Sequence, residues 1–269
     1  MKTTTRTLAC GVSLLLLAQV AEAMTGREVM QEQKDRHSVD SEVASDTLVL
    51  VDSKGNSEQR EVRRYYKALP GDEKRALVVF ADPADIRGTA LMIWNHPKGE
   101  TDQWLFLPSQ NKLQRVARSS RNSYFMGTDF TYGDMEVEDL DSYNYTVARE
   151  EAVDGQDCYV IEAIAKEDAQ KEKSKSPYSK RVLWVRKDVF VTVKVEFYDR
   201  RGTLAKTQTN HDFVNARDKA WRPQKAVMVN HARNHKTLIG TRSRQVGDPV
   251  SDDLFTERYI LSGKHLGPP

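Results

Sequence analysis

Residues 189–199 read VFVTVKVEFYD, and they alternate between apolar and polar side chains as a half-buried β-strand does. One face of this strand is expected to carry the apolar set, Val189, Val191, Val193, Val195 and Phe197. The other face is expected to carry Thr192, Lys194, Glu196 and Tyr198. A strand with one apolar and one polar face is typical of an antiparallel sheet that encloses a core on one side and meets water on the other.

Similar β-rich runs follow one another along most of the chain, and Gly, Pro or Asn ends most of them. They occupy residues 45–69, 75–83, 88–97, 102–116, 143–166, 181–209 and 225–244. Roughly ten strands in meander order, with only short helices, predict a mainly β fold of the α+β class. We expect one antiparallel sheet that curls into a barrel or half-barrel. The sequence shows no βαβ alternation, which argues against a Rossmann or TIM-barrel architecture.

Short helices are expected near both ends of this domain. Residues 25–37 combine a Thr25 N-cap with Glu28 three positions later, which is a capping box. The face shared by Val29 and Gln33 has little apolar content, so this helix is expected to lie on a surface. Residues 251–261 (SDDLFTERYIL) begin with Ser251 and two acids and continue with apolar residues, as a short capped helix does.

The first 23 residues have the three parts of a secretory signal peptide. Lys2 and Arg6 form the basic part, residues 8–20 the apolar part, and Ala-Glu-Ala at 21–23 the cleavage site. We therefore expect an exported, periplasmic chain in which residues 24–269 form a single domain. Cys158 is the only cysteine that remains after cleavage, so no internal disulfide framework is expected. The nearly balanced charge, +2 in total, excludes the basic stripe of a nucleic-acid-binding protein.

The sequence carries no recognisable catalytic signature: it has no G-x-S-x-G, P-loop, HExxH or CxxC motif. His231 and His235 have a spacing that would suit one metal ion on a helix. Their neighbours favour a strand instead, on which the two imidazoles would stand roughly 13 Å apart. We interpret both as ordinary surface histidines, and we expect no metal, no cofactor and no enzymatic activity.

Residues 119–136 (SSRNSYFMGTDFTYGDME) follow neither a helical nor a strand period, yet they are rich in aromatic residues. The stretch could be a catalytic loop, a ligand gate or a plug, and the lack of a nucleophile–base pair removes the first of these. Asp129 and Asp134 are expected to cap exposed amides, either in turns or at the start of a short helix over 134–140. As a lid or plug over the barrel mouth we predict the side chains of Phe125, Met126, Phe130 and Tyr132.

Residues 104–140 (WLFLPSQNKLQRVARSSRNSYFMGTDFTYGDMEVEDL) resemble the exported outer membrane lipoprotein-sorting proteins, relatives of the LolA/LolB carrier fold. The resemblance rests on W-L-[FY]-L-P, on K-L-x-R-V and on F-M-G-[ST]-D-F-[TS]-Y-x-D, and it extends to residues 181–207 and 221–241. It implies a half-open antiparallel barrel with an apolar concave face that holds acyl chains and needs no cofactor. It also implies an inner-membrane transporter of the RND (MMPL-like) type as a partner.

We predict a periplasmic, non-enzymatic carrier that binds lipid or acylated cargo in an apolar barrel cavity. It would serve an RND exporter or the traffic of lipids and lipoproteins to the outer membrane. The alternative is a periplasmic adaptor of an RND transporter that carries no ligand and fills its interior with tryptophan and phenylalanine. The residues predicted to line this cavity are Met92, Trp94, Trp104, Phe106, Trp184, Val191, Val193, Val195 and Phe197. For any one of them, a place in an ordinary core is an equally good interpretation.

Overall fold

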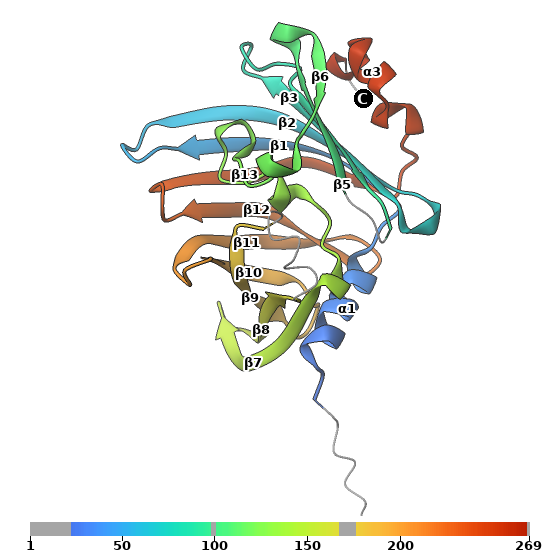
Figure 1. Cartoon of the computed structure of the whole chain (residues 1–269). Coiled ribbons are helices and arrows are strands. Elements are labelled where there is room, and N and C mark those ends of the chain that lie inside the picture. Colours follow the sequence, from blue (N-terminus) through green and yellow to red (C-terminus); the bar gives the residue numbers. More distant parts are fainter. Residues whose placement is uncertain (1–22, 98–100, 167–175, 268–269) are drawn as a thin grey trace, which may run out of the picture.

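The computed structural model describes residues 23–97, 101–166 and 176–267, so the predicted signal peptide lies outside the described residues except for its last position. The described chain forms one antiparallel sheet of thirteen strands whose two edges do not meet. Figure 1 shows this sheet twisted and curved, with α1 near one edge and α3 near the other. The predicted mainly β fold, an open antiparallel sheet with short helices, is confirmed, although the strands outnumber the ten expected.

The chain builds the sheet in two meanders that meet in its middle. The first runs outward from the centre through β1 (Ser41–Val51), β2 (Ser57–Ala68), β3 (Lys74–Asp82), β4 (Ala90–Asn95), β5 (Thr101–Leu107) and β6 (Lys112–Arg115). The second returns from the opposite edge through β7 (Tyr143–Val153), β8 (Gln156–Ala165), β9 (Tyr178–Arg186), β10 (Thr192–Asp199), β11 (Leu204–Arg217), β12 (Ala220–Asn230) and β13 (His235–Val246). β13 pairs with β1, with Leu48 opposite Ile239, and this pairing joins the two halves into one sheet.

Residues 116–142 join β6 at one edge of the sheet to β7 at the other, and we call this segment the crossover. Neighbouring strands lie about 4.8 Å apart. A connection between the two edges of so wide a sheet therefore has to pass over one of its faces. Figure 1 shows the crossover in green, running across the sheet from β6 to β7. We call the face that it covers the inner face and the opposite one the outer face.

The inner face buries two apolar clusters beneath the crossover and α1 (Gly26–His37). Phe125 and Tyr132 of the crossover pack onto β1–β4, while Leu140 and α1 pack onto β8–β10. The helix begins at the predicted capping box, with Thr25 and Glu28 bonded reciprocally. Its expected surface position is wrong, because Val29 and Met30 are buried in the core.

Gly26 explains how closely the start of α1 can approach β7. A Cβ atom at this position would lie 2.7 Å from the carbonyl carbon and oxygen of Tyr145, which is closer than real Cβ atoms come. Because backbone atoms make this contact, no side-chain rearrangement could relieve it. A glycine is therefore required where the helix meets the edge strand.

The outer face of β3–β5 is covered by the C-terminal segment, which contains η7 (Asp252–Phe255), α3 (Glu257–Leu261) and η8 (Lys264–Leu266). Phe255 and Ile260 pack there against Leu77, Val79 and Met92. The indole N–H of Trp94 donates to the carbonyl of Phe255 over 3.1 Å. This second core explains why β4 and β5 are apolar on both sides.

The alternation of residues 189–199 is interrupted, so the predicted single apolar face is wrong for Val193. The pairing of β10 with β9 shifts between Thr192 and Lys194, which is a β-bulge. A bulge places two successive residues opposite one and changes the face that the following side chains occupy. Val193 consequently packs into the outer cluster, whereas Val195 and Phe197 lie in the inner one.

The expected helix over residues 134–140 is also wrong. Single 3₁₀ turns cover Gly133–Met135 and Leu140–Ser142, and Glu136 and Asp139 between them are extended. In the described part of the chain, no helix combines the length and the apolar content needed to cross a membrane.

Removing the anchor of the C-terminal segment should destabilise the whole sheet. Ile260→Ala is expected to lower the free energy of unfolding by about 2–5 kcal/mol, because it opens a cavity in a fully buried site. The neighbouring Leu261 is 44% exposed, so Leu261→Ala should change stability by less than about 0.5 kcal/mol. Urea denaturation of both variants measures the difference, and equal losses would contradict the packing described above.

Candidate functional site

Asp129 fixes the middle of the crossover to the sheet, and its side chain is fully buried. One carboxylate oxygen accepts a hydrogen bond of 2.8 Å from the hydroxyl of Thr237 and lies 2.6 Å from Nδ1 of His235. The backbone N–H of Asp129 donates to the Thr237 hydroxyl over 2.9 Å. A buried carboxylate is stable only where such partners replace water. The crossover is therefore held at one register on β13.

These contacts correct two predictions. Asp129 does not cap an exposed amide, because it is buried against β13. His235 is not an ordinary surface histidine, since its side chain is only 12% exposed and faces Asp129. His231 is exposed and bonds to Thr207, as a surface histidine would. The two histidines stand on opposite sides of the β12–β13 turn rather than along one strand.

Lys206 of β11 forms a second anchor beside the first. Its ammonium donates to the backbone carbonyl of Asp129 over 2.7 Å and to the carboxylate of Asp134 over 2.9 Å. The side chains of Lys206 and Asp134 are 4% and 7% exposed, so this ion pair is buried. The hydroxyl of Tyr178 donates to Asp134 as well, and burial together with this carboxylate raises the pKa of Tyr178 well above its usual range.

Asp134 also accepts from the backbone N–H of Thr131 over 2.8 Å, so it caps a turn as predicted, but the amide is buried rather than exposed.

Four further polar contacts tie the crossover to strands on both halves of the sheet. Gln103 donates to the carbonyl of Tyr132 over 2.9 Å, and Asn230 donates to the hydroxyl of Tyr124 over 2.8 Å. The guanidinium of Arg60 donates to the carbonyl of Met126. Arg121 of the crossover donates in the other direction, to the carbonyl of Thr101.

A cavity of about 750 Å³ lies between the later part of the crossover and strands β9–β11. Cavities of roughly 300–1,000 Å³ are typical of small-molecule sites. Leu183, Val195 and Phe197 give it an apolar floor, and Tyr143 and Tyr178 add aromatic walls. The crossover contributes a polar rim on the opposite side, with Arg121, Asp134, Glu136, Glu138 and Asp139. The cavity is therefore amphipathic.

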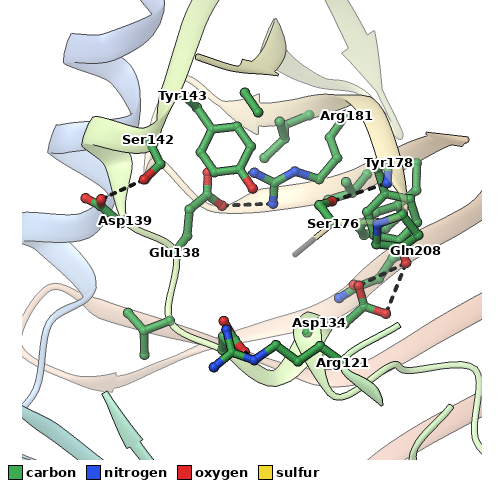
Figure 2. Close-up of a pocket in the computed structure, with 18 of the residues that line it drawn as sticks. Arg121, Asp134, Glu138, Asp139, Ser142, Tyr143, Ser176, Tyr178, Arg181 and Gln208 are labelled. Atoms are coloured by element: carbon green, nitrogen blue, oxygen red, sulfur yellow. Dashed lines mark hydrogen bonds and ion pairs between the residues drawn. The ribbon is translucent and has the colours of Figure 1, made fainter. Parts of the chain in front are cut away.

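Most charges on this rim are paired, either within the crossover or with cations of the sheet. Figure 2 shows Glu138 and Arg181 facing each other, and their two hydrogen bonds measure 2.7 and 2.9 Å. The hydroxyl of Tyr145 donates to the same carboxylate. Arg121 lies 3.1 Å from Glu136.

Burial and the neighbouring Glu138 raise the pKa of Tyr145 far above its usual range, so its phenol stays neutral. Burial opposes the charge of Arg181, but the Glu138 carboxylate outweighs it and raises the pKa of Arg181. Neither group can exchange a proton near neutral pH, as a general acid or base would have to.

A second cavity of about 340 Å³ adjoins the first, since Val137, Thr192 and Asn210 line both. It lies between the end of α1 and the strands β2, β3 and β12, and it includes His37 and Trp221. Among the described residues, no three His, Cys, Asp or Glu side chains are grouped closely enough to hold a metal ion.

The structure brings together only some of the predicted lining residues. Val195 and Phe197 line the larger cavity, and Val191 lines the smaller one. Trp184 and Val193 lie in the outer cluster of β8–β10. The other candidates pack on the outer face beneath the C-terminal segment, namely Met92, Trp94, Trp104 and Phe106.

The four residues predicted as a lid or plug also divide between two places. Phe125 and Tyr132 are buried in the inner cluster of β1–β4, and Met126 packs at its margin. Phe130 packs against the inner cluster of β8–β10.

The polar rim was missed by the sequence prediction. Glu138 and Arg181 are separated by 43 positions, and neither belongs to a recognisable motif. The one available signal is the concentration of acids in residues 134–141, of which Asp134 and Glu138 pair with cations of the sheet.

Known proteins of similar sequence and structure identify the family and the fold of this chain. A family model that carries only the description of an uncharacterized protein matches residues 72–262. A crystal structure from Vibrio parahaemolyticus, named as an outer membrane lipoprotein-sorting protein domain, is 30% identical in sequence. It superposes with a TM-score of 0.81 over 88% of this chain and 98% of that one. Among proteins of curated function, none is similar in sequence to this chain.

Two more distant structures share the fold. A DUF1329 family protein from Desulfovibrio piger is 24% identical, with a TM-score of 0.81 over 87% of this chain and 97% of that one. A LolA superfamily protein from Nitrosomonas europaea is 21% identical, with a TM-score of 0.66 over 88% and 100%. The architecture is thus a LolA-like open antiparallel sheet. The chain belongs to the family of the outer membrane lipoprotein-sorting proteins.

Removal of the buried cation should release the crossover. Lys206→Met leaves the Asp134 carboxylate buried without its counter-ion, which is expected to cost about 3–5 kcal/mol of unfolding free energy. The double variant Lys206→Met/Asp134→Asn should recover part of this loss. Lys225 forms an exposed ion pair with Asp212, so Lys225→Met is a matched control that should leave stability unchanged. A loss in the control as large as that in Lys206→Met would contradict the anchoring role.

Proposed function

We propose that this protein is a periplasmic carrier that holds an acyl chain in the cavity beneath the crossover and catalyses no reaction. The proposal rests on the cavity itself, an amphipathic space of about 750 Å³ that the side chains of the sheet and the crossover leave unfilled. Its apolar floor suits an acyl chain, and its polar rim suits the boundary with water. The similar Vibrio protein is named as a lipoprotein-sorting protein domain, and this name supports the same class of cargo.

The expected affinity follows from the area that a chain would bury. Each methylene removed from water contributes about 0.8 kcal/mol. Ten buried methylenes therefore give about 8 kcal/mol, and the cost of immobilising the ligand reduces the net gain. A net gain below about 8 kcal/mol corresponds to dissociation constants above about 1 µM, which hold a chain in transit and still permit its release.

The alternative function, a transporter adaptor without a ligand, calls for an interior filled by large aromatic side chains. Trp94, Trp104 and Trp184 pack on the outer face, and they leave the inner cavity free. This placement favours the carrier. An RND-type exporter as the partner is proposed on the family resemblance alone.

A substitution that fills the cavity without touching the core tests the carrier function. Gln208 lines the larger cavity, while the adjacent Thr207 of β11 bonds to His231 on the other face. Gln208→Trp should weaken the binding of 1-monopalmitoylglycerol at least about tenfold, whereas Thr207→Trp should leave it unchanged. Displacement of the dye 1-N-phenylnaphthylamine measures both, and urea denaturation confirms that both variants fold. Failure of the wild-type protein to bind the acyl glycerol would overturn the proposal.

A further inference from the structure

The smaller cavity differs from the larger one in the charge of its walls. Its apolar part includes Val39, Phe213 and Trp221, and its charged lining residues are Lys34, Lys74 and Arg222. No carboxylate is found among the described residues that line it. Apolar walls combined with cations of one sign are complementary to an anionic group attached to an apolar chain.

The carboxylates that pair with these cations lie outside the lining of the cavity. Lys34 and Lys74 share the single carboxylate of Asp72, at 3.7 and 3.2 Å, and Asp72 is 61% exposed. Arg222 likewise shares Glu42 with Arg244, at 2.8 and 3.0 Å.

One further carboxylate, Asp40, is exposed and close enough to Tyr66 in the cavity wall to affect its titration. Three cations thus line the smaller cavity, whereas the three carboxylates near them, Asp72, Glu42 and Asp40, are not among its lining residues.

The end of α1 also faces this cavity, and its carbonyls carry partial negative charge. That charge is largely compensated. The guanidinium of Arg222 donates to the carbonyl of His37 over 2.9 Å, and the hydroxyl of Ser38 donates to the carbonyl of Lys34 over 2.7 Å.

His37 lines the cavity as an uncharged side chain. Its Nδ1 accepts from the backbone N–H of Trp221, while its Nε2 faces the carbonyls of Val189 and Phe190. Burial lowers the pKa of His37, so it adds no charge near neutral pH.

The two cavities adjoin each other on the inner face, and three residues line both. Val137 of the crossover lines both, and it is an apolar side chain that is nevertheless 42% exposed. Thr192 and Asn210 lie at the same junction. A chain in the larger cavity can therefore continue past Val137 to the cationic end.

The larger cavity does not offer an equivalent place for an anion. Three arginines line it: Arg121 and Arg181 are paired with Glu136 and Glu138, and Arg200 donates to the carbonyl of Ser176. Asp134 is likewise bound to Lys206. An anionic head group would gain more at the smaller cavity, whose lining includes three cations and no carboxylate.

We propose that the smaller cavity binds the anionic head group, a carboxylate or a phosphate, of the amphiphile whose acyl chain occupies the larger cavity. This inference rests on the carrier function proposed above and narrows its cargo to anionic amphiphiles. Lys34 and Lys74 at the mouth and Arg222 on the wall contact the head group.

The test compares three amphiphiles with the same chain and different head groups. The intact protein should bind palmitate and 1-palmitoyl-lysophosphatidate about tenfold more tightly than uncharged 1-monopalmitoylglycerol, measured by displacement of 1-N-phenylnaphthylamine. Lys34→Gln/Lys74→Gln should remove this preference and leave the binding of the glyceride unchanged. Lys112→Gln/Lys225→Gln removes the same charge from residues that line neither cavity, and it should keep the preference.

The possible outcomes are separable. Equal binding of all three amphiphiles, or a preference that survives in Lys34→Gln/Lys74→Gln, overturns the head-group site and leaves the carrier function intact. Displacement of palmitate by inorganic phosphate at the same concentration would indicate a site for free anions and would also overturn the inference. Binding of none of the amphiphiles overturns both proposals.

Discussion

A single buried lysine, Lys206 of β11, links the crossover to the strands beneath it. The ammonium of Lys206 bonds to the carbonyl of Asp129 and to the carboxylate of Asp134, both in the crossover. Without such an anchor, a connection between opposite edges of a wide open sheet would have no fixed path over its face. A buried ion pair adds little net stability compared with apolar packing, but removing one partner is costly. Its contribution here is to specify where the crossover lies.

The fixed path of the crossover determines where the cavity forms. From Tyr124 to Asp134 the segment is tightly bound to the sheet and adds Phe125 and Tyr132 to the core. Beyond Asp134 it is held by the buried Leu140 and by contacts at the rim, such as the paired Glu138 and Arg181, and it leaves space above β9–β11. The first half packs into the core as a plug would, and under the proposed carrier function the second half is the part that yields to a ligand.

The sequence predicts the strands well because alternation and turn residues are local properties. The capping box of Thr25 and Glu28 likewise needs only neighbouring positions, and it is present as expected. The assignment of side chains to one face of the sheet fails where the same sequence pattern fits either face. Trp104 looks like a cavity residue, but the C-terminal segment covers it on the outer face, and one bulge turns Val193 outward. The polar anchors escape prediction altogether, since Asp129 meets Lys206 and His235 across 77 and 106 positions.

Amide hydrogen exchange of the intact protein, with and without 1-monopalmitoylglycerol, tests this division of the crossover most directly. Peptides from residues 124–134 should exchange slowly in both conditions, because amides such as those of Phe125 and Asp129 are bonded within the core. Peptides from residues 136–142 should exchange faster and become protected when the acyl glycerol is added. Equal exchange in both halves without ligand would contradict a fixed plug joined to a movable cover. So would ligand-induced protection that appears only outside the crossover and β9–β11.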